Sequence, residues 1–315
     1  MAKHLKEMGA KGGSGVFSTP SIQDEVDDAT STSDLLRIDT SGLKELNCRP
    51  SLVRYVRDLH DWRHFIFADA RSKALNSGRG MFLGRAWLVL QPLFDVSVYA
   101  VIFGLILHVS RGIENYIGYL VIGVVFFRYI SRGISSGAGL VQSSRSLIAS
   151  FTFPRAAVVF SAVIRQFLDN LIPLVVALTL AFAYQFPAGP SWTLVLLPPL
   201  YVLVHVFILG LMLFISRVTA FIPDIKPLIG LFNRALFFTS GIFYSLERFD
   251  GHPVMAAIMQ GNPVYQFLTA ARDITIYGVV PPSTTVLALL AWTATLFLLG
   301  LIYFWNAEER YATVG

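Results

Sequence analysis

The sequence predicts an all-α integral membrane protein with six transmembrane helices. Of its 315 residues 54% are hydrophobic, and the mean hydropathy is +0.60, whereas soluble domains contain about 45 to 50% apolar residues. Six apolar stretches follow residue 85, each near or above the ~20 residues that a helix needs to cross the hydrocarbon core. The stretches are 86–107, 117–139, 156–184, 194–216, 228–246 and 284–305.

Two different segments precede these stretches. Residues 1–48 are rich in Gly, Ser, Thr and Asp without apolar periodicity, so we expect a disordered cytoplasmic tail. Residues 49–80 are predicted to form an amphipathic interface helix, because apolar residues recur there at steps of three and four. The sequence offers no other soluble domain that could cover the apolar face of this helix. We therefore favour an in-plane position at the lipid headgroups over packing in a core. The apolar positions are Leu52, Tyr55, Val56, Leu59, Trp62, Ile66 and Ala70.

The charges predict the orientation of the six-helix domain, residues 81–310. Starting from a cytoplasmic N-terminus, six crossings return the C-terminal tail, residues 311–315, to the cytoplasm. This places Arg145, Arg155, Arg217 and Lys226 in cytoplasmic loops, as the positive-inside rule requires. The basic residues therefore indicate membrane topology, and we expect no nucleic-acid partner.

A few ionisable groups lie at membrane depth. Arg165 and Asp169 are spaced i and i+4, so they can pair on one helix face. We expect His205 to be a neutral, hydrogen-bonded residue in helix packing and Asp95 to be solvated near the interface. The single cysteine, Cys48, excludes an internal disulfide, and the sequence has no zinc-ligand spacing.

Residues 247–280 are too apolar for an ordinary loop and too broken to span. Glycine and proline divide them into two short pieces, which predicts a re-entrant external hairpin that gates the channel; an interfacial hairpin without a gating role is the alternative. Asn262 is a suitable N-cap before Pro263 at the first helical position, and Tyr277-Gly278 ends the helix. Arg272 and Asp273 are expected to face water. The predicted gate residues are Asn262, Pro263, Tyr265, Phe267 and Arg272, and the predicted apolar face is Val264, Phe267, Leu268, Ala271 and Ile274.

Residues 50–310 resemble the permeases of ABC-type exporters of cell-surface polysaccharides, such as O-antigen, teichoic acid and mycobacterial galactan. The resemblance is carried, in order, by Leu83-Gly84, Trp87 and Gln91-Pro92; by Phe153-Pro154-Arg155; by Arg217 with Asp224-Ile225 and Ser240-Gly241-Ile242-Phe243-Tyr244; and by Asn262-Pro263, Arg272 and Tyr277-Gly278. This chain differs from many such permeases, since Arg217 and Asp224 are not adjacent and Gly241 stands where those permeases have proline.

The resemblance implies a permease that moves lipid-linked polysaccharide to the outer face of the bacterial inner membrane. The chain has no Gly-x-x-x-x-Gly-Lys-Ser/Thr sequence, so ATP and Mg are expected on a separate subunit. The implied partners are a second copy of the chain, two nucleotide-binding ATPase subunits, membrane lipid and a polyprenyl-pyrophosphate-linked polysaccharide. The implied ATPase-coupling residues are Arg57, Trp62, Arg145, Phe153, Pro154, Asp224 and Lys226.

Aromatic side chains in the first, second and fifth stretches are the candidates for a sugar-conducting channel. Their flat apolar faces suit sugar C–H groups, and tyrosine adds a hydroxyl; lipid contact or packing is the alternative. The candidates are Phe94, Tyr99, Phe127, Phe237, Phe238, Phe243 and Tyr244. An exporter of small hydrophobic molecules is a second reading. A polyprenyl-phosphate-dependent glycosyltransferase or acyltransferase is disfavoured, because the acidic residues after position 85 are scattered.

Overall fold

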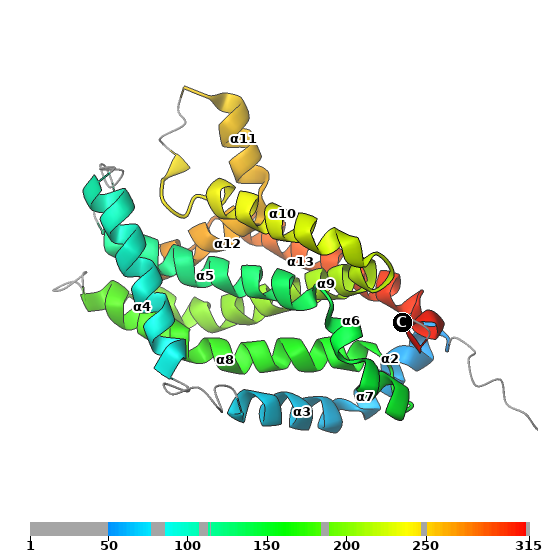
Figure 1. Cartoon of the computed structure of the whole chain (residues 1–315). Coiled ribbons are helices and arrows are strands. Elements are labelled where there is room, and N and C mark those ends of the chain that lie inside the picture. Colours follow the sequence, from blue (N-terminus) through cyan, green and yellow to red (C-terminus); the bar gives the residue numbers. More distant parts are fainter. Residues whose placement is uncertain are drawn as a thin grey trace, which may run out of the picture. The chain divides into compact units, whose positions relative to one another are not determined.

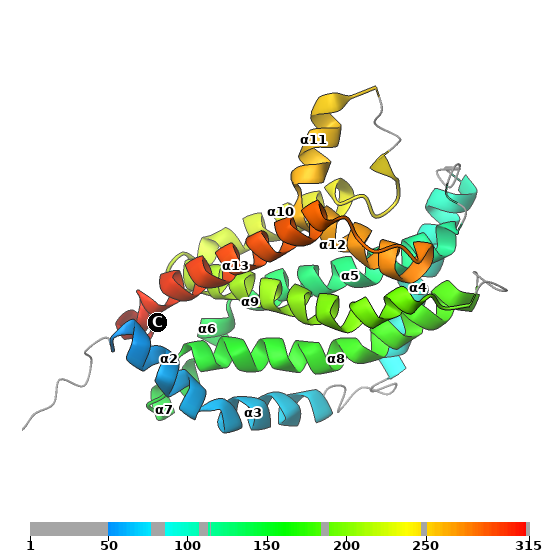
Figure 2. The same cartoon turned by 180° about the vertical axis from the view of Figure 1, so that it is seen from behind.

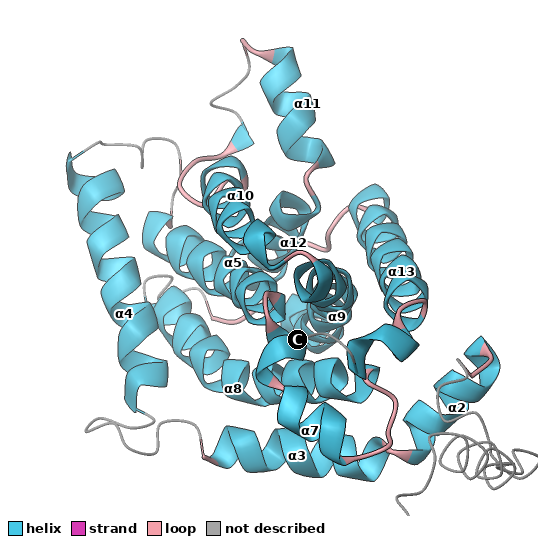
Figure 3. Cartoon of the chain, turned by 45° about the vertical axis from the view of Figure 1, so that its right-hand side comes forward, coloured by secondary structure: helices cyan, strands magenta, loops and turns pink. Residues whose placement is uncertain are grey.

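A computed structural model describes residues 50–76, 86–106, 113, 115–183, 189–246 and 251–312. The predicted tail and the 77–85 junction, with Leu83 and Gly84, lie outside these described residues. The chain divides into the units Met1–Asn47 and Cys48–Gly315, and the following concerns the second. Every regular element in its described residues is a helix, which confirms the all-α class (Figure 3).

Each predicted apolar stretch contains a helix. In order, these are α4 (Trp87–Tyr99) continued by the π-helix η3 (Ala100–Ile106), α5 (Tyr116–Gly137), α8 (Ala156–Ala183), α9 (Leu197–Phe221) preceded by the 3-10 helix η4 (Trp192–Leu196), α10 (Lys226–Thr239) and α13 (Ser283–Trp305). Shorter connecting elements are α6 (Leu140–Ser143), α7 (Arg145–Ser150), η5 (Pro223–Ile225) and η8 (Glu308–Ala312).

Among the described helices, four are long and apolar enough to cross a membrane: α5, α8, η4 with α9, and α13. The apolar run Val89–Ile102, which extends from α4 into η3, is shorter. Helix α10 has 14 residues, or about 21 Å of length, against a hydrocarbon core of about 30 Å. Four of the expected crossings are therefore supported, while the count of six and the orientation of the termini stay predictions.

Helix α5 is the centre of the bundle and packs against α8, α9 and α12 (Figure 1). Helices α9 and α13 form the most extensive pair. Their backbones approach at two glycines: a Cβ on Gly210 would lie 2.6 Å from the carbonyl carbon of Leu296, and one on Gly300 would lie 2.6 Å from the carbonyl oxygen of Gly210. Small residues permit this close contact, which is typical of membrane helices.

The amphipathic segment forms two helices, α2 (Leu52–Asp61) and α3 (Arg63–Leu75), that join at Trp62. The predicted face is confirmed for Tyr55, Leu59, Ile66 and Ala70, which are buried, but not for Val56, which is 46% exposed. However, the expectation that no protein covers this face is wrong, because α3 runs alongside α8 (Figures 1 and 2). The first half of α8 supplies the missing apolar surface. A position of the segment at the lipid headgroups stays a prediction.

Candidate functional site

Five of the seven candidate channel aromatics meet in one cluster centred on Phe237. Its ring centre lies 5.5 Å from that of Tyr99, 5.1 Å from Phe127, 5.3 Å from Phe238 and 5.1 Å from Phe243. These side chains come from α4, α5, α10 and the turn after α10. The structure thus gathers rings from three separate apolar stretches.

The other two candidates lie in different surroundings. The Tyr244 hydroxyl donates a hydrogen bond to the carbonyl oxygen of Phe238, so Tyr244 adjoins the cluster. Phe94 is exposed and instead contacts Trp87, at 6.4 Å between ring centres. We therefore assign Phe94 to the outer surface of α4 rather than to the cluster.

A cavity of about 250 Å³ adjoins the aromatic cluster. Beside the rings it is lined by polar side chains, Asp95, Arg128, Ser131, Asn233 and Arg234. Asp95 forms an ion pair with Arg128, which corrects the expectation that Asp95 is simply solvated. The Asn233 amide donates to the Ser131 hydroxyl at 2.7 Å, and its buried Oδ1 has no partner in the described part of the chain. The cavity therefore combines apolar ring faces with hydrogen-bonding groups.

The predicted hairpin consists of α11 (Pro253–Gly261), α12 (Pro263–Arg272) and the π-helix η7 (Asp273–Tyr277); residues 247–250 lie outside the described residues. The Asn262 side chain accepts a hydrogen bond from the Val264 amide at 2.9 Å, and Pro263 occupies the first helical position. Gly278, with φ of 63°, ends η7. The predicted caps are confirmed, and so is the buried apolar face, Val264, Phe267, Leu268, Ala271 and Ile274.

Arg272 does not face water as the sequence suggested, and only 2% of it is exposed. Its guanidinium donates to the carbonyl oxygens of Tyr119 at 3.1 Å, Gly241 at 3.0 Å and Ile242 at 3.2 Å. It also lies over the Tyr119 ring, 3.4 Å from the ring centre. The i+4 spacing from buried Leu268 to Arg272 was the available signal, because it places both on one helix face.

These contacts fasten the hairpin to the turn that follows α10. Gly241 in this turn has φ of 63°, and a Cβ there would lie 2.8 Å from the Tyr265 ring. The single proton of the Tyr119 hydroxyl is shared between the carbonyl oxygens of Gly241 at 3.0 Å and Tyr244 at 2.7 Å. The same turn carries Phe243 and Tyr244, so the hairpin contacts the segment that supplies two of the candidate channel aromatics.

The predicted coupling residues differ in how far their side chains are exposed. Trp62 and Phe153 meet directly, 5.8 Å apart between ring centres. Pro154, which follows Phe153 in the sequence, is also buried. Lys226 is half-buried, and its side chain lies close to Gly139. The remaining three, Arg57, Arg145 and Asp224, are exposed.

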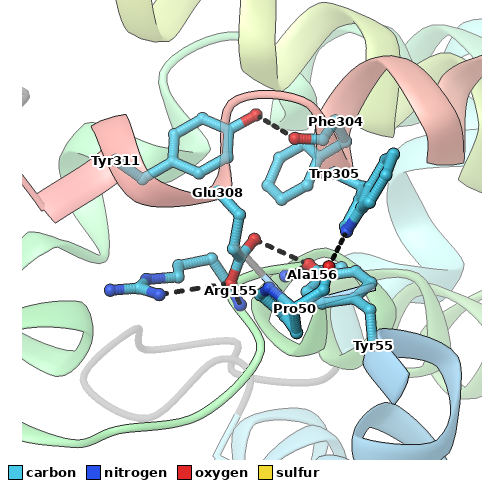
Figure 4. A network of polar contacts seen from close by, with 8 residues as sticks. All are labelled: Pro50, Tyr55, Arg155, Ala156, Phe304, Trp305, Glu308 and Tyr311. Atoms are coloured by element: carbon cyan, nitrogen blue, oxygen red, sulfur yellow. Dashed lines mark hydrogen bonds and ion pairs between the residues drawn. The ribbon is translucent and has the colours of Figure 1, made fainter. Parts of the chain in front are cut away.

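Glu308 joins three distant segments and was not identified from the sequence (Figure 4). Its carboxylate accepts hydrogen bonds from the Tyr55 hydroxyl at 2.8 Å and from the Arg155 backbone amide at 2.8 Å. The Tyr55 hydroxyl in turn accepts from the Ala156 amide at 3.1 Å. Burial raises the pKa of Glu308, although these donors and the Arg155 guanidinium oppose the shift. The amphipathic segment, the Phe-Pro-Arg junction and the C-terminal end therefore form one joint.

The polar residues predicted inside the bundle have partners. Arg165 and Asp169 form the expected pair, 3.5 Å apart. His205 is buried, with Nε2 3.1 Å from the Asn170 amide and Nδ1 2.7 Å from the Tyr201 carbonyl oxygen. This confirms a hydrogen-bonded histidine in helix packing.

Comparison with known proteins agrees with this architecture. Residues 66–276, more than half of the chain, match the ABC-2 type transporter family. The O-antigen export system permease protein RfbA of Myxococcus xanthus is 22% identical over 261 residues, which cover 83% of this chain and 99% of that protein. RfbA of Klebsiella pneumoniae is 22% identical over 237 residues, covering 75% and 89% respectively. The chain therefore belongs to the ABC-2 type transporter family, as a multi-pass membrane permease.

Proposed function

We propose that this chain is the transmembrane subunit of an ATP-driven exporter that moves lipid-linked cell-surface polysaccharide from the cytoplasmic to the outer face of the bacterial inner membrane. The two RfbA proteins, named for O-antigen export, support polysaccharide as the cargo. The chain performs no bond chemistry. Two copies form the channel with two nucleotide-binding subunits, which hold ATP and Mg.

The observation that carries the proposal is the aromatic cluster around Phe237 with its polar cavity. Aromatic faces pack against the C–H groups of sugars, while Asn233, Ser131 and the Asp95–Arg128 pair offer donors and acceptors for sugar hydroxyls. Contacts of this kind are individually weak, which suits a polymer that must slide.

Two further regions support the mechanism. The Trp62–Phe153 contact and the exposed residues Arg145, at the start of α7, and Asp224, in η5, are suitable contact points through which a nucleotide-binding subunit could transmit movement. The hairpin held by Arg272 gates the outer end of the path. Its bonds to the Gly241 turn would pass gate movement to the aromatic cluster.

Depletion of the protein in its native bacterium tests the cargo. We expect lipid-linked polysaccharide to accumulate on the cytoplasmic side and surface polysaccharide to fall. Complementation with the natural sequence should restore export, whereas the triple variant Phe127→Ala, Phe238→Ala and Tyr244→Ala should assemble without restoring it. Normal surface polysaccharide after depletion would reject the cargo, and accumulation of small hydrophobic compounds instead would favour a drug exporter.

The purified chain tests the source of energy. Alone it should hydrolyse no ATP, and activity should appear when the nucleotide-binding subunit is co-expressed. ATP turnover by the isolated chain that survives further purification would contradict the division of labour.

A further inference from the structure

A groove lies between α3 and α8, and the proposed transport path does not use it. It consists of two cavities of about 730 and 280 Å³ that share Phe67, Arg71 and Leu75. The first cavity is also lined by Arg63, His64, Ala68, Ser72 and Ile164, and the second by Ala74, Leu168, Asp169 and Ile172. None of these residues lines the cavity beside the aromatic cluster.

One end of the groove is cationic. Arg63, His64, Arg71 and Ser72 all line the first cavity, and in the described part of the chain no carboxylate pairs with Arg71. Guanidinium groups bind phosphate oxygens through paired N–H donors, and a serine hydroxyl adds another donor. This end therefore suits a phosphate group.

Asp69 of α3 and Asp169 of α8 do not cancel this charge, because each pairs with another cation. Asp69 pairs with Lys73 at 2.7 Å and accepts a hydrogen bond from Ser161. Asp169 lines the second cavity but pairs with Arg165 at 3.5 Å. Arg63 and Arg71 thus leave a net positive charge in the groove.

The second cavity is lined mainly by apolar side chains, although Arg71 and Asp169 also contribute to it. Phe67 and Leu75 are 52% and 53% exposed, and they lie beside Leu168 and Ile172 of α8. Exposed apolar residues next to a cationic cluster form the amphipathic pattern of a lipid contact. A hydrocarbon chain along these side chains would remove their surface from water.

The length of α8 is compatible with a headgroup position for the cationic end of the groove. Its 28 residues give about 42 Å, roughly 12 Å more than the hydrocarbon core, so an untilted α8 would extend into the headgroup region. Helix α3 lies against the first half of α8, as the Asp69–Ser161 contact shows. The cationic end of the groove is nearer the start of α8, and the apolar end is further along it.

We propose that this groove binds an acidic glycerophospholipid, with its phosphate between Arg63 and Arg71 and an acyl chain along Leu75, Leu168 and Ile172. The lipid holds α3 against α8 and so stiffens the segment that carries Trp62 into the coupling region. The inference does not depend on which cargo the permease moves.

Native mass spectrometry of the purified full-length protein tests the site, with phosphatidylglycerol and phosphatidylcholine as probes. Removing one surface cation weakens anionic lipid binding by about 1 kcal/mol, or about fivefold. We therefore expect Arg71→Gln to weaken phosphatidylglycerol binding by that factor. The matched control is Arg54→Gln, which removes the same charge from the exposed face of α2 outside the groove, and it should leave binding unchanged. Ile172→Trp should also weaken binding, because the larger side chain would fill the second cavity.

Three results would overturn the proposal. Equal losses in the Arg71 and Arg54 variants would mean diffuse attraction to a basic surface. Equal binding of phosphatidylcholine and phosphatidylglycerol would remove the role of the net charge. Displacement of phosphatidylglycerol by equimolar undecaprenyl phosphate, abolished by Arg71→Gln, would make the groove a site for a polyprenyl carrier.

Discussion

Replacing Arg272 with methionine should release the external hairpin from the turn after α10. Methionine is unbranched and apolar, so it can replace the aliphatic stem of arginine. It lacks the N–H donors that reach the carbonyls of Tyr119, Gly241 and Ile242. Gly241 retains a donor, the Tyr119 hydroxyl, and the Tyr119 carbonyl lies within α5, where the helix supplies its bond. The Ile242 carbonyl loses the donor that Arg272 provides.

The expected cost follows from these partners. One orphaned buried carbonyl costs about 1 to 3 kcal/mol, and loss of the desolvated contact between the guanidinium and the Tyr119 ring costs about 2 kcal/mol. Removing a buried charge returns part of this, because the guanidinium no longer has to be kept out of water. We expect a net weakening of hairpin docking by about 2 to 4 kcal/mol, or roughly a hundredfold. Arg272→Lys should be intermediate, since one ammonium lacks the planar fork.

Cysteine modification measures this docking. In a Cys48→Ala background, a cysteine at buried Val264 should react with a maleimide about a hundredfold faster when Arg272 is methionine, because opening exposes it. Gly123→Ala should have the same effect although residue 272 remains arginine, since the new Cβ would clash with the guanidinium. Gly230→Ala is the control, because a Cβ there meets nothing within 4 Å. Unchanged reactivity in both test variants would refute the clamp.

Three more outcomes are expected. Phe237→Ala should slow polysaccharide export while ATPase activity is retained, because its ring joins four others in the cluster; exposed Phe232 on the same helix is the alanine control, and equal export by both variants would count against the channel face. Glu308 has a raised pKa, so the folded protein binds its proton more tightly than the unfolded chain, and stability should fall as pH rises above about 4.5. Thermal unfolding between pH 4.5 and 8 should show a weaker decline in Glu308→Gln, and an identical profile would contradict the assignment. Gly210→Leu should separate α9 from α13 and lower the unfolding temperature of the detergent-purified protein, whereas Gly230→Ala should not; an unchanged temperature in Gly210→Leu would show that the close glycine contact is dispensable.

The sequence alone determined most local features. Apolar stretches predicted a helix in every case, and the Asn262 cap, Pro263 and the Gly278 stop all lie where their backbone preferences require. Periodicity identified the buried faces of α2, α3 and α12, because residues three and four apart share a helix face. The residue types in the first, second and fifth apolar stretches also supplied the aromatic candidates, five of which meet in the cluster. These properties depend on neighbours within a few turns of the chain.

Only the tertiary structure decided which distant groups meet. Asp95 of α4 forms an ion pair with Arg128 of α5, and Glu308 accepts a hydrogen bond from Tyr55 near the other end of the described chain. Arg272 is buried against Tyr119. Periodicity assigns a residue to a face but says nothing of what covers that face, which depends on how the helices cross. A charge that would face water on an isolated helix can be buried once carbonyls and a ring are packed around it, as they are for Arg272.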